Sequence, residues 1–213
     1  VIVGDQTLTA TFGVTNVDHP LPVDADTYFQ IGSITKTYTG TTIMRLVEDG
    51  LLDLEAPVRT YLPDFRVADP QVSEEVKIWH LLTHTGGWYD LFQLETGDGD
   101  DALALAVAAL ADAPQVTPPG KYFSYNNSGL MVAGRVIEAV TGQPYETAVI
   151  EQVADPLGTG QSFFLEELIT RGAVAVGHAV SPEGQPIVIE PWALPRSENP
   201  AGGLTASLND QLQ

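Results

Sequence analysis

The sequence has no cysteine, few basic residues and no long apolar run, and each absence excludes a class of protein. Without cysteine there are no disulfides, no thiol nucleophile and no cysteine-ligated zinc. Nine lysines and arginines stand against 28 aspartates and glutamates, which gives a net charge of −19. A surface this acidic repels phosphate backbones and anionic lipids, so we expect no nucleic-acid partner. No apolar run approaches the ~18 residues of a membrane span, so we expect no membrane insertion.

The chain is nevertheless long enough and apolar enough to fold around a core. It has 213 residues, of which 44% are hydrophobic, and this composition argues against disorder. It opens Val1-Ile2-Val3-Gly4 without an initiator methionine or a signal-peptide pattern, and it closes on an amphipathic run with no helix stop. We therefore expect a fragment of a longer gene product.

Turn residues and hydrophobic periodicity divide the chain into a strand pair, a series of helices and a looser end. Short β-branched runs around Gly4-Asp5 predict a hairpin of residues 1–3 and 7–14. Residues 173–180 and 187–189 predict strands around the turn 182–184. Helices are expected at 33–49, 57–62, 78–82, 102–111 and 128–140, and after Pro144. The expected buried face of the first helix comprises Ile34, Tyr38, Met44, Leu46 and Val47.

Ser33 and Lys36 form a Ser-x-x-Lys motif at the start of the first predicted helix. With eight serines and three lysines, the expected number of chance matches is about 0.1 per sequence. Positions i and i+3 share a helix face, so the Lys36 amine can reach the Ser33 hydroxyl. The helix N-terminus disfavours a cation, which favours the neutral amine that a general base needs. The alternative is that Ser33 caps the helix while Lys36 extends into solvent.

A second polar group, Tyr125-Asn126-Asn127, stands on an irregular segment just ahead of a predicted helix. The phenol of Tyr125 suits a proton relay beside a lysine. Asn127 offers an amide to a substrate carbonyl or to that lysine. The alternative makes Tyr125 a core aromatic residue and Asn127 the N-cap of the following helix.

With their surroundings, these motifs resemble the serine β-lactamase and penicillin-binding-protein superfamily, and above all its class C β-lactamase-like branch. The resemblance is carried by YFQIGSITK at 28–36, LVEDG at 46–50, YLP at 61–63, IWHLLTHTGG at 78–87, PGKYFSYNNSG at 119–129 and PAGGL at 200–204. It implies an α/β (α+β) fold of the β-lactamase/transpeptidase type. An all-helical lobe over residues 50–160 would adjoin an antiparallel-sheet lobe that is incomplete in this chain.

The resemblance also implies an organisation and a set of site residues. We expect one incomplete domain over 1–213, with N-terminal strands and a loop at 1–32, a helical region at 33–160 and a fringe of strands and loops at 161–213. Ser33 would be the acylated nucleophile, with Lys36 and Tyr125 sharing the proton transfers, since the acylation base is disputed in this superfamily. Asn127 would position the substrate. The Ser33 N–H would supply half of an oxyanion hole, with no cofactor and no metal.

The function implied is that of a serine hydrolase acting on β-lactams, esters or D-amino-acid peptides, so the expected partner is a small-molecule or peptide substrate. The alternatives are a non-catalytic penicillin-binding-like relative, a truncated inactive fragment, or an unrelated helical domain. Members of the family are often exported, which favours a bacterial extracytoplasmic location, periplasmic or secreted.

The chain departs from the family pattern in one motif. The family carries a Lys/His-x-Gly triplet on a strand after the Tyr-x-Asn segment, and no such triplet follows Asn127. His84-Thr85-Gly86 has the right letters but precedes Tyr125, and we expect Gly177-His178-Ala179 to lie in a hairpin. His80 and His84 have a spacing found in zinc sites, but no glutamate follows His80, so we expect structural roles for both.

We expect the 213 residues alone to be inactive or severely impaired, with any catalytic strand coming from a further C-terminal segment of the same gene product. In the family, that strand supplies the second oxyanion donor and the contact to the substrate carboxylate. The measurement is turnover of a chromogenic ester by this chain and by a longer chain from the same gene. Equal rates for the two chains would contradict the expectation.

Overall fold

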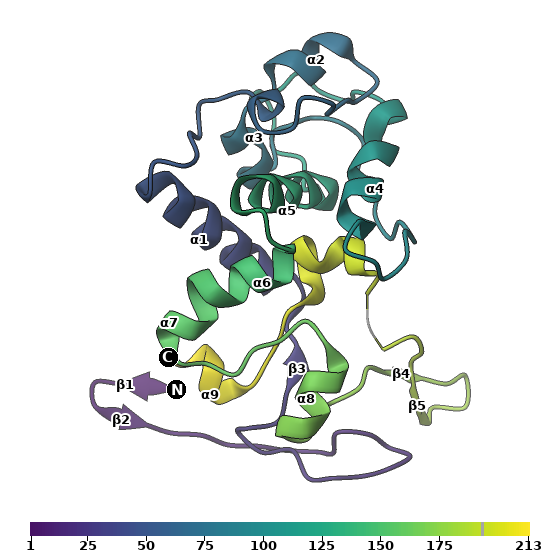
Figure 1. Ribbon diagram of the computed structural model, residues 1–213. Coiled ribbons are helices and arrows are strands. Elements are labelled where there is room, and N and C mark those ends of the chain that lie inside the picture. The colour runs from purple at the N-terminus through teal and green to yellow at the C-terminus, as the bar shows by residue number, and fades with distance from the viewer. Residues whose placement is uncertain (193) are drawn as a thin grey trace.

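In Figure 1 the upper part of the molecule is helical, and the lower part combines the short strands and loops with several of the later helices. The computed structural model describes residues 1–192 and 194–213, and the side chains of these residues other than 165 and 166. The helices are α1 (Thr35–Glu48), α2 (Pro70–Glu75), α3 (Ile78–Leu82), α4 (Ala102–Ala108), α5 (Asn127–Thr141), α6 (Tyr145–Val149), α7 (Asp155–Leu157), α8 (Leu165–Arg171) and α9 (Leu208–Gln211). Single helical turns lie at Gly32–Ile34, Val58–Thr60, Ala109–Asp112, Ile150–Ala154, Arg196–Glu198 and Asn199–Gly203. In the described part of the chain, no helix has the length and apolarity that a bilayer crossing requires.

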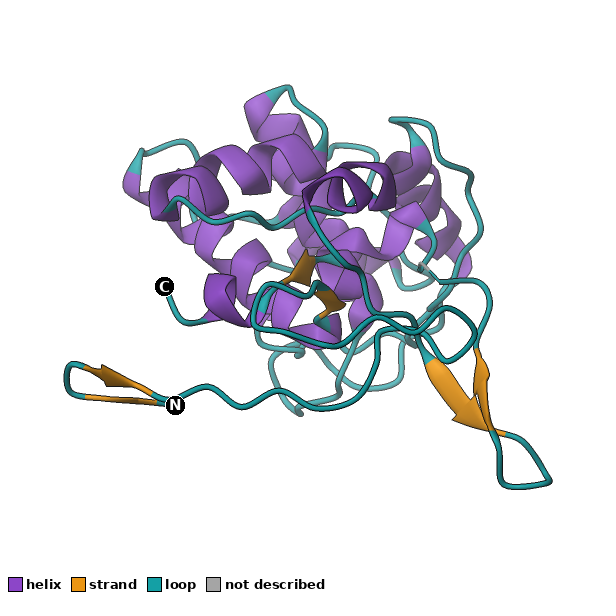
Figure 2. Cartoon of the chain, turned by 90° about the horizontal axis from the view of Figure 1, so that it is seen from below, coloured by secondary structure: helices purple, strands orange, loops and turns teal. Residues whose placement is uncertain are grey.

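Three antiparallel strand pairs form the sheet structure of the described residues, and with the helices they confirm the expected α+β class. The strands are β1 (Ile2–Val3), β2 (Gln6–Thr7), β3 (Phe29–Gln30), β4 (His178–Val180), β5 (Pro186–Val188) and β6 (Thr205–Ala206). The hairpins β1–β2 and β4–β5 project from opposite sides of the body in both views (Figures 1 and 2). The second strand of the first hairpin ends at Thr7 rather than Val14, because Val14 bridges to Pro22 instead.

The central helix α5 is surrounded by other helices (Figure 1). Nine of its 15 residues are buried, as expected for a helix that is apolar on most sides. Its first turn is capped by the side-chain oxygen of Asn126, which accepts the N–H of Gly129 at 2.7 Å. The helix ends at Gly142, whose φ of +70° costs glycine little. The helix predicted at 128–140 is therefore confirmed, with Asn126 rather than Asn127 as its cap.

The buried face of α1 is largely polar, which corrects part of the sequence-based expectation. Thr35 and Thr39 are buried, whereas Ile34 and Met44 are 51% and 48% exposed. The reason is that these threonines bond backbone groups of the segment 200–204, where Thr35 Oγ1 accepts the N–H of Leu204 at 3.2 Å. Thr39 Oγ1 donates to the carbonyl oxygen of Pro200 at 2.8 Å. A hydroxyl satisfies a buried carbonyl that an apolar side chain would leave unpaired.

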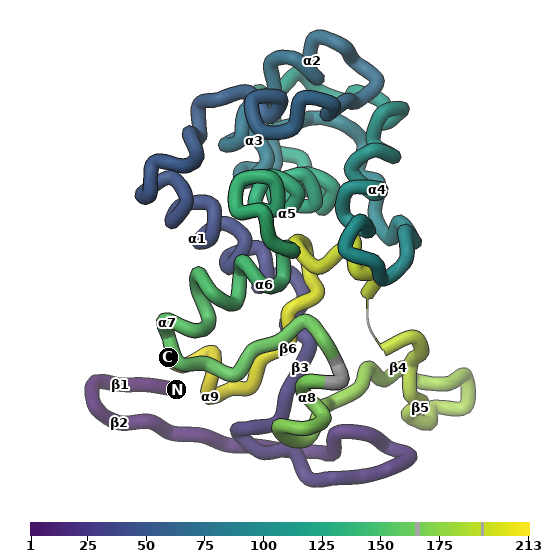
Figure 3. Tube along the Cα trace, viewed as in Figure 1, coloured from purple at the N-terminus to yellow at the C-terminus, as the bar shows by residue number. Residues whose placement is uncertain are grey.

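The pairing of β3 with β6 joins an early and a late part of the chain beneath the helical region (Figure 3). Phe29 lies opposite Ala206, and the N–H of Ile31 extends the pairing by donating to the carbonyl of Leu204 at 2.9 Å. Strands of two residues leave no periodicity in a sequence, so neither was predicted. The pairing places the turn 199–203 beside the start of α1.

Two further helices differ from the expectation. Helix α2 lies where the sequence pattern predicts no helix. Its Asp69-Pro70 start is a capping signal, since Asp69 Oδ1 accepts the N–H groups of Gln71 and Val72 at 2.9 and 3.2 Å. Residues 161–213 are expected to hold strands and loops, but helix α8 forms within them, so this part of the expectation is wrong. The predicted helix at 102–111 is confirmed, although α4 ends at Ala108 and a tighter turn continues to Asp112.

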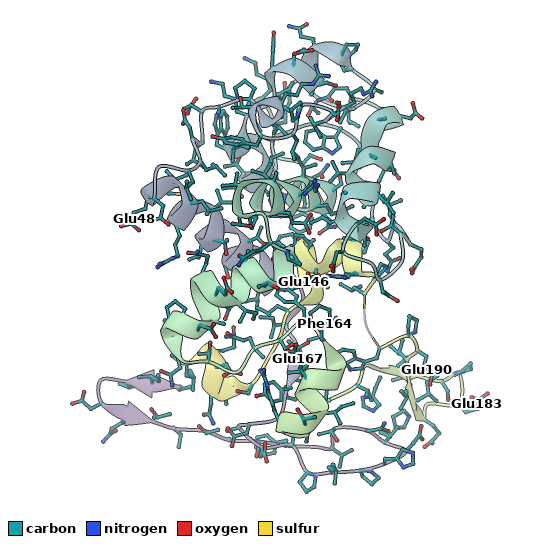
Figure 4. All side chains as sticks on the ribbon, in the orientation of Figure 1. Glu48, Glu146, Phe164, Glu167, Glu183 and Glu190 are labelled. Atoms are coloured by element: carbon teal, nitrogen blue, oxygen red, sulfur yellow. The ribbon has the colours of Figure 1, made fainter. Side chains whose placement is uncertain are left out.

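Glu146 is a buried carboxylate that joins α6 to the segment 196–199 (Figure 4). Arg196 Nε and Nη2 donate to its two oxygens at 3.1 and 3.2 Å. Asn199 Nδ2 donates to Oε1 at 2.7 Å. Arg196 also donates to the carbonyl of Asp98 at 2.6 Å and to the Asp100 carboxylate at 2.9 Å. Both charges of the buried pair are therefore matched, and they attach the turn to α6.

We expect Glu146→Ala to lower the free energy of unfolding by about 3–5 kcal/mol, because it removes the buried partner of Arg196 and leaves only the exposed Asp100 carboxylate to match that charge. Denaturation by urea measures this loss. Glu183→Ala, in the exposed turn of the β4–β5 hairpin, is the control and should change the free energy by less than about 0.5 kcal/mol. A loss as small as the control's would show that the ion pair does not stabilise this junction.

Candidate active site

Ser33 lies in the single helical turn Gly32–Ile34 that leads into α1. Gly32 has a φ of +54°, which lets the chain bend sharply out of β3. Thr35 Oγ1 donates to the carbonyl of Gly32 at 2.7 Å and accepts the N–H of Leu204 at 3.2 Å. The first amides of a helix, including that of Ser33, have no partner within the helix.

The Ser33 hydroxyl contacts both the amine of Lys36 and the phenol of Tyr125. Ser33 Oγ and Tyr125 Oη are 2.7 Å apart, and either can donate. Lys36 Nζ donates to Ser33 Oγ at 3.0 Å and lies 4.9 Å from the centre of the Tyr125 ring. Tyr125 is 48% exposed, so it is not a core aromatic residue. The structure thus brings together three of the four residues that the two motifs single out, one of them 92 positions away.

A further contact of Lys36 is not visible in the sequence. Nζ donates to the carbonyl oxygen of Ala201 at 2.6 Å, across 165 residues of chain. A backbone carbonyl has no side-chain signature, so only the resemblance of residues 200–204 to a family loop marks this segment. The lysine is therefore oriented by two acceptors rather than extended into solvent.

Two glycines leave room for close contacts of the turn 199–203. A side chain at Gly203 would overlap the side-chain oxygen of Asn199. A Cβ at Gly202 would meet Leu194 at 3.1 Å and the backbone of Gly32 at 3.7 Å. The close approach puts the Ala201 carbonyl within reach of Lys36.

Asn127 is the first residue of α5, and its amide is oriented by an acidic residue. Its Nδ2 donates to Asp90 Oδ2 at 2.9 Å, while the N–H of Ser128 donates to Asp90 Oδ1 at 2.8 Å. Within 1–192 and 194–213, no hydrogen bond joins the Asn127 amide to Ser33 or Lys36. Asn127 is thus near Tyr125 in the chain but does not contact the other two candidate residues.

The histidines that the sequence singles out have separate environments. His80 Nδ1 accepts the N–H of Lys77 at 2.9 Å and caps α3. His84 stacks on Tyr125, with 4.5 Å between ring centres. His178 lies in the β4–β5 hairpin, as expected. Over the residues that the structure describes, no three histidine, aspartate or glutamate side chains are grouped to hold a metal ion.

Glu198 is a fully buried carboxyl near the site that sequence reasoning missed, because nothing in the sequence marks its burial. Its Oε1 accepts the N–H of Gln93 at 2.8 Å, and among the described residues Oε2 has no hydrogen-bond partner. Burial raises the pKa of Glu198 from 4.5 to about 7. The Asp90 charge acts in the same direction, whereas the Gln93 N–H and Lys36 oppose it. Near neutral pH the group is therefore partly protonated.

A cavity of about 690 Å³ adjoins the strand that leads into Ser33. Its lining includes Phe29, Gln30, Gln93, Glu95, Trp192 and Leu194. The volume lies in the range of ligand pockets, about 300–1,000 Å³, and the mixture of apolar walls with a few polar groups is typical of them. The cavity lies beside β3, two strand residues of which line it, whereas Ser33 itself is not among its lining residues.

This geometry agrees with the comparison of the chain with protein families. The model of the family described as Beta-lactamase matches residues 1–213. The chain belongs to the β-lactamase family. The resemblance to the serine β-lactamase and penicillin-binding-protein superfamily is thereby confirmed, and with it membership of a family of hydrolases.

Individual β-lactamase-family relatives match over most of the chain. Penicillin-binding protein 4 of Amycolatopsis lactamdurans is 40% identical over 206 residues, which are 94% of this chain and 53% of the relative. Esterase EstB of Burkholderia gladioli is 39% identical over 169 residues, 72% of this chain and 42% of the relative. The octameric penicillin-binding protein homologue from Pyrococcus abyssi matches in structure with a TM-score of 0.76 and 32% identity, over 94% of this chain and 46% of that one. The chain spans about half the length of the curated relatives it matches.

The buried Glu198 predicts that stability falls as the pH rises. Its folded-state pKa of about 7 exceeds the ordinary 4.5, so its stabilising contribution is complete below pH 4.5 and is lost as the pH rises through 7. The difference between these two pKa values corresponds to about 3 kcal/mol in the free energy of unfolding. Glu198→Gln, which is neutral at every pH, should flatten the profile measured by urea denaturation. Glu190→Gln, at an exposed position, is the control, and parallel profiles for wild type and Glu198→Gln would contradict the prediction.

Proposed function

We propose that Ser33 is the nucleophile of a serine hydrolase that forms an acyl-enzyme with β-lactams, esters or D-amino-acid peptides. The observation that carries this proposal is the contact of Ser33 Oγ with Tyr125 Oη at 2.7 Å and with Lys36 Nζ at 3.0 Å. A serine hydroxyl is a weak nucleophile until a neighbouring base accepts its proton. Lys36 accepts that proton as a neutral amine, and Tyr125 accepts it as a phenolate.

In acylation, Ser33 Oγ attacks the substrate carbonyl carbon, and its proton passes to the Lys36–Tyr125 pair. We assign the base to the pair jointly, since each member is within hydrogen-bond distance of Ser33 Oγ. The carbonyl oxygen takes the negative charge, and the Ser33 N–H at the opening of the helix supplies one donor to it. Collapse of this intermediate breaks the bond to the amine or alkoxide leaving group. That group takes up the proton and either departs or, in a β-lactam, stays attached through the opened ring, and an ester is left on Ser33.

In deacylation, water attacks the ester carbonyl while the Lys36–Tyr125 pair accepts its proton. The second collapse breaks the bond to Ser33 Oγ, which regains the proton, and releases the carboxylic acid. The Ala201 carbonyl, 2.6 Å from Lys36 Nζ, supports this role because it keeps the amine beside Ser33 through both half-reactions. Tyr125 is exposed enough to meet an incoming water.

Asn127 is assigned to substrate positioning. Asp90 holds one N–H of its amide, which leaves the other N–H and the carbonyl oxygen to bind an amide group of a substrate. The names of the relatives, a penicillin-binding protein and an esterase, support substrates whose carbonyl carbon is open to a serine. The activity proposed is that of the whole protein, in which these residues supply the nucleophile and its proton-transfer partners.

A fluorophosphonate or fluorescent penicillin should label Ser33 in the full-length wild-type protein, and Ser33→Ala should abolish the label. Lys36→Met and Tyr125→Phe should each lower the labelling rate by about 10²–10⁴-fold, the range of general acid–base catalysis. The rate is measured by mass spectrometry of the intact protein over time.

The matched controls are Ser181→Ala, Lys77→Met and Tyr122→Phe, which remove the same groups from positions outside the site. They should label at the wild-type rate. Absence of label on wild-type Ser33 with both reagents would sink the proposal in favour of a non-catalytic relative.

A further inference from the structure

His84 bonds to the chain on both sides of Tyr125. Its backbone carbonyl accepts the N–H of Ser124 at 2.9 Å. Its ring Nδ1 lies 3.1 Å from both the backbone nitrogen and the backbone oxygen of Asn126. An unprotonated Nδ1 accepts from the N–H and a protonated one donates to the oxygen, so either tautomer bonds to Asn126. The two residues that flank Tyr125 are thereby attached to one histidine.

The imidazole of His84 also packs on the phenol itself. The rings of His84 and Tyr125 are 4.5 Å apart and inclined by 25°, which is a stacked arrangement. The ring of Phe123 packs against the imidazole of His84 edge to face, with 5.6 Å between ring centres and an angle of 77° between the ring planes. A half-exposed side chain on an irregular segment keeps its rotamer only where a neighbour packs against it. The imidazole is such a neighbour for Tyr125.

The conformation of His84 is itself unusual. Its φ of +55° lies in the left-handed region, which costs a non-glycine residue about 1–3 kcal/mol and is found where surrounding contacts impose it. Burial lowers the pKa of His84, and the nearby Lys36 charge adds to this, so the ring is neutral at neutral pH. A neutral ring adds no charge beside Lys36 and Tyr125, although Asp90 is also near.

We propose that His84 is a positioning residue that holds the Tyr125 phenol against Ser33, through its bond to the Asn126 backbone and its stack on the Tyr125 ring. The inference rests on the proposed function, in which Tyr125 shares the proton transfers of Ser33. In this role His84 neither binds a metal ion nor acts as the first residue of a Lys/His-x-Gly motif.

Three substitutions separate the two contacts. Asn places an amide atom where Nδ1 lies and tolerates a positive φ, so His84→Asn keeps the backbone bond and loses the stack. His84→Phe keeps a stacking ring and loses the bond. His84→Ala loses both. The matched control is His80→Ala, because His80 also bonds a backbone N–H through Nδ1 and packs at a tilt of 32° on the ring of Trp79, with 3.8 Å between ring centres.

The first measurement is the labelling of Ser33 by a fluorophosphonate, resolved into reversible binding (KI) and the covalent step (kinact). We expect His84→Asn and His84→Phe to lower kinact by about 3–10-fold each, and His84→Ala by about 30-fold or more, with KI within about twofold of wild type. His80→Ala should lower the melting temperature as His84→Ala does and leave kinact within about twofold of wild type.

A merely structural role for His84 would give a different result. An unchanged kinact in His84→Ala, an equal loss in His80→Ala, or a change in KI in place of kinact would each overturn the inference.

A second measurement reads the position of Tyr125 without catalysis. In protein with ¹³C-labelled tyrosine rings, the Tyr125 signal is assigned by its loss in Tyr125→Phe. Stacking predicts an upfield ring-current shift that disappears in His84→Ala and persists in His84→Phe. An unlabelled Ser33 with this shift intact would refute the proposed function alone. Labelling of Ser33 with no change of the Tyr125 signal in His84→Ala would refute the role of His84 alone.

Discussion

The contact of Lys36 with both Ser33 and the Ala201 carbonyl is the constraint on which the rest of the site depends. An amine has donors in several directions, and two of them are used here, at 3.0 and 2.6 Å. One partner is a neighbour on the same helix and the other belongs to a turn near the end of the chain. The position of the amine is therefore decided by how these two parts of the molecule pack.

Much of the surrounding structure serves to keep that turn against α1. The β3–β6 pairing brings its end beside the strand that leads into Ser33. The buried Glu146–Arg196 pair and Asn199 attach its start to α6, and Gly202 and Gly203 leave room for Leu194 and for the Asn199 side chain. Two buried threonines of α1 serve the same contact, since Thr39 donates to the Pro200 carbonyl and Thr35 accepts the N–H of Leu204.

Burial of charged groups accompanies this arrangement. The Glu146 carboxylate is fully matched by Arg196 and Asn199, whereas the Glu198 carboxyl has one bond from a backbone N–H and a raised pKa. Such groups cost folding free energy, and they gather where a site requires a particular backbone path. Here both lie next to the turn that contacts Lys36.

The helices that sequence reasoning predicted correctly are those with local signals. The α5 helix has an asparagine cap and a following glycine, and α3 is a compact apolar run whose bounds match the prediction. The strands β3 and β6 have two residues each, and α8 lies in a segment without clear periodicity. Elements of that kind exist because of the segments they pair or pack with, so local patterns do not predict them.

By itself, the sequence determined the spacing that puts Lys36 one helical turn from Ser33, and the order of motifs that marks the β-lactamase family. Only the tertiary structure decided that Tyr125 reaches Ser33 across 92 residues, that the Ala201 carbonyl holds Lys36, and that His84 stacks on Tyr125. The reason is physical. Helix geometry relates residues a few positions apart, whereas burial, stacking and contacts to backbone carbonyls depend on segments that only the packed fold brings together.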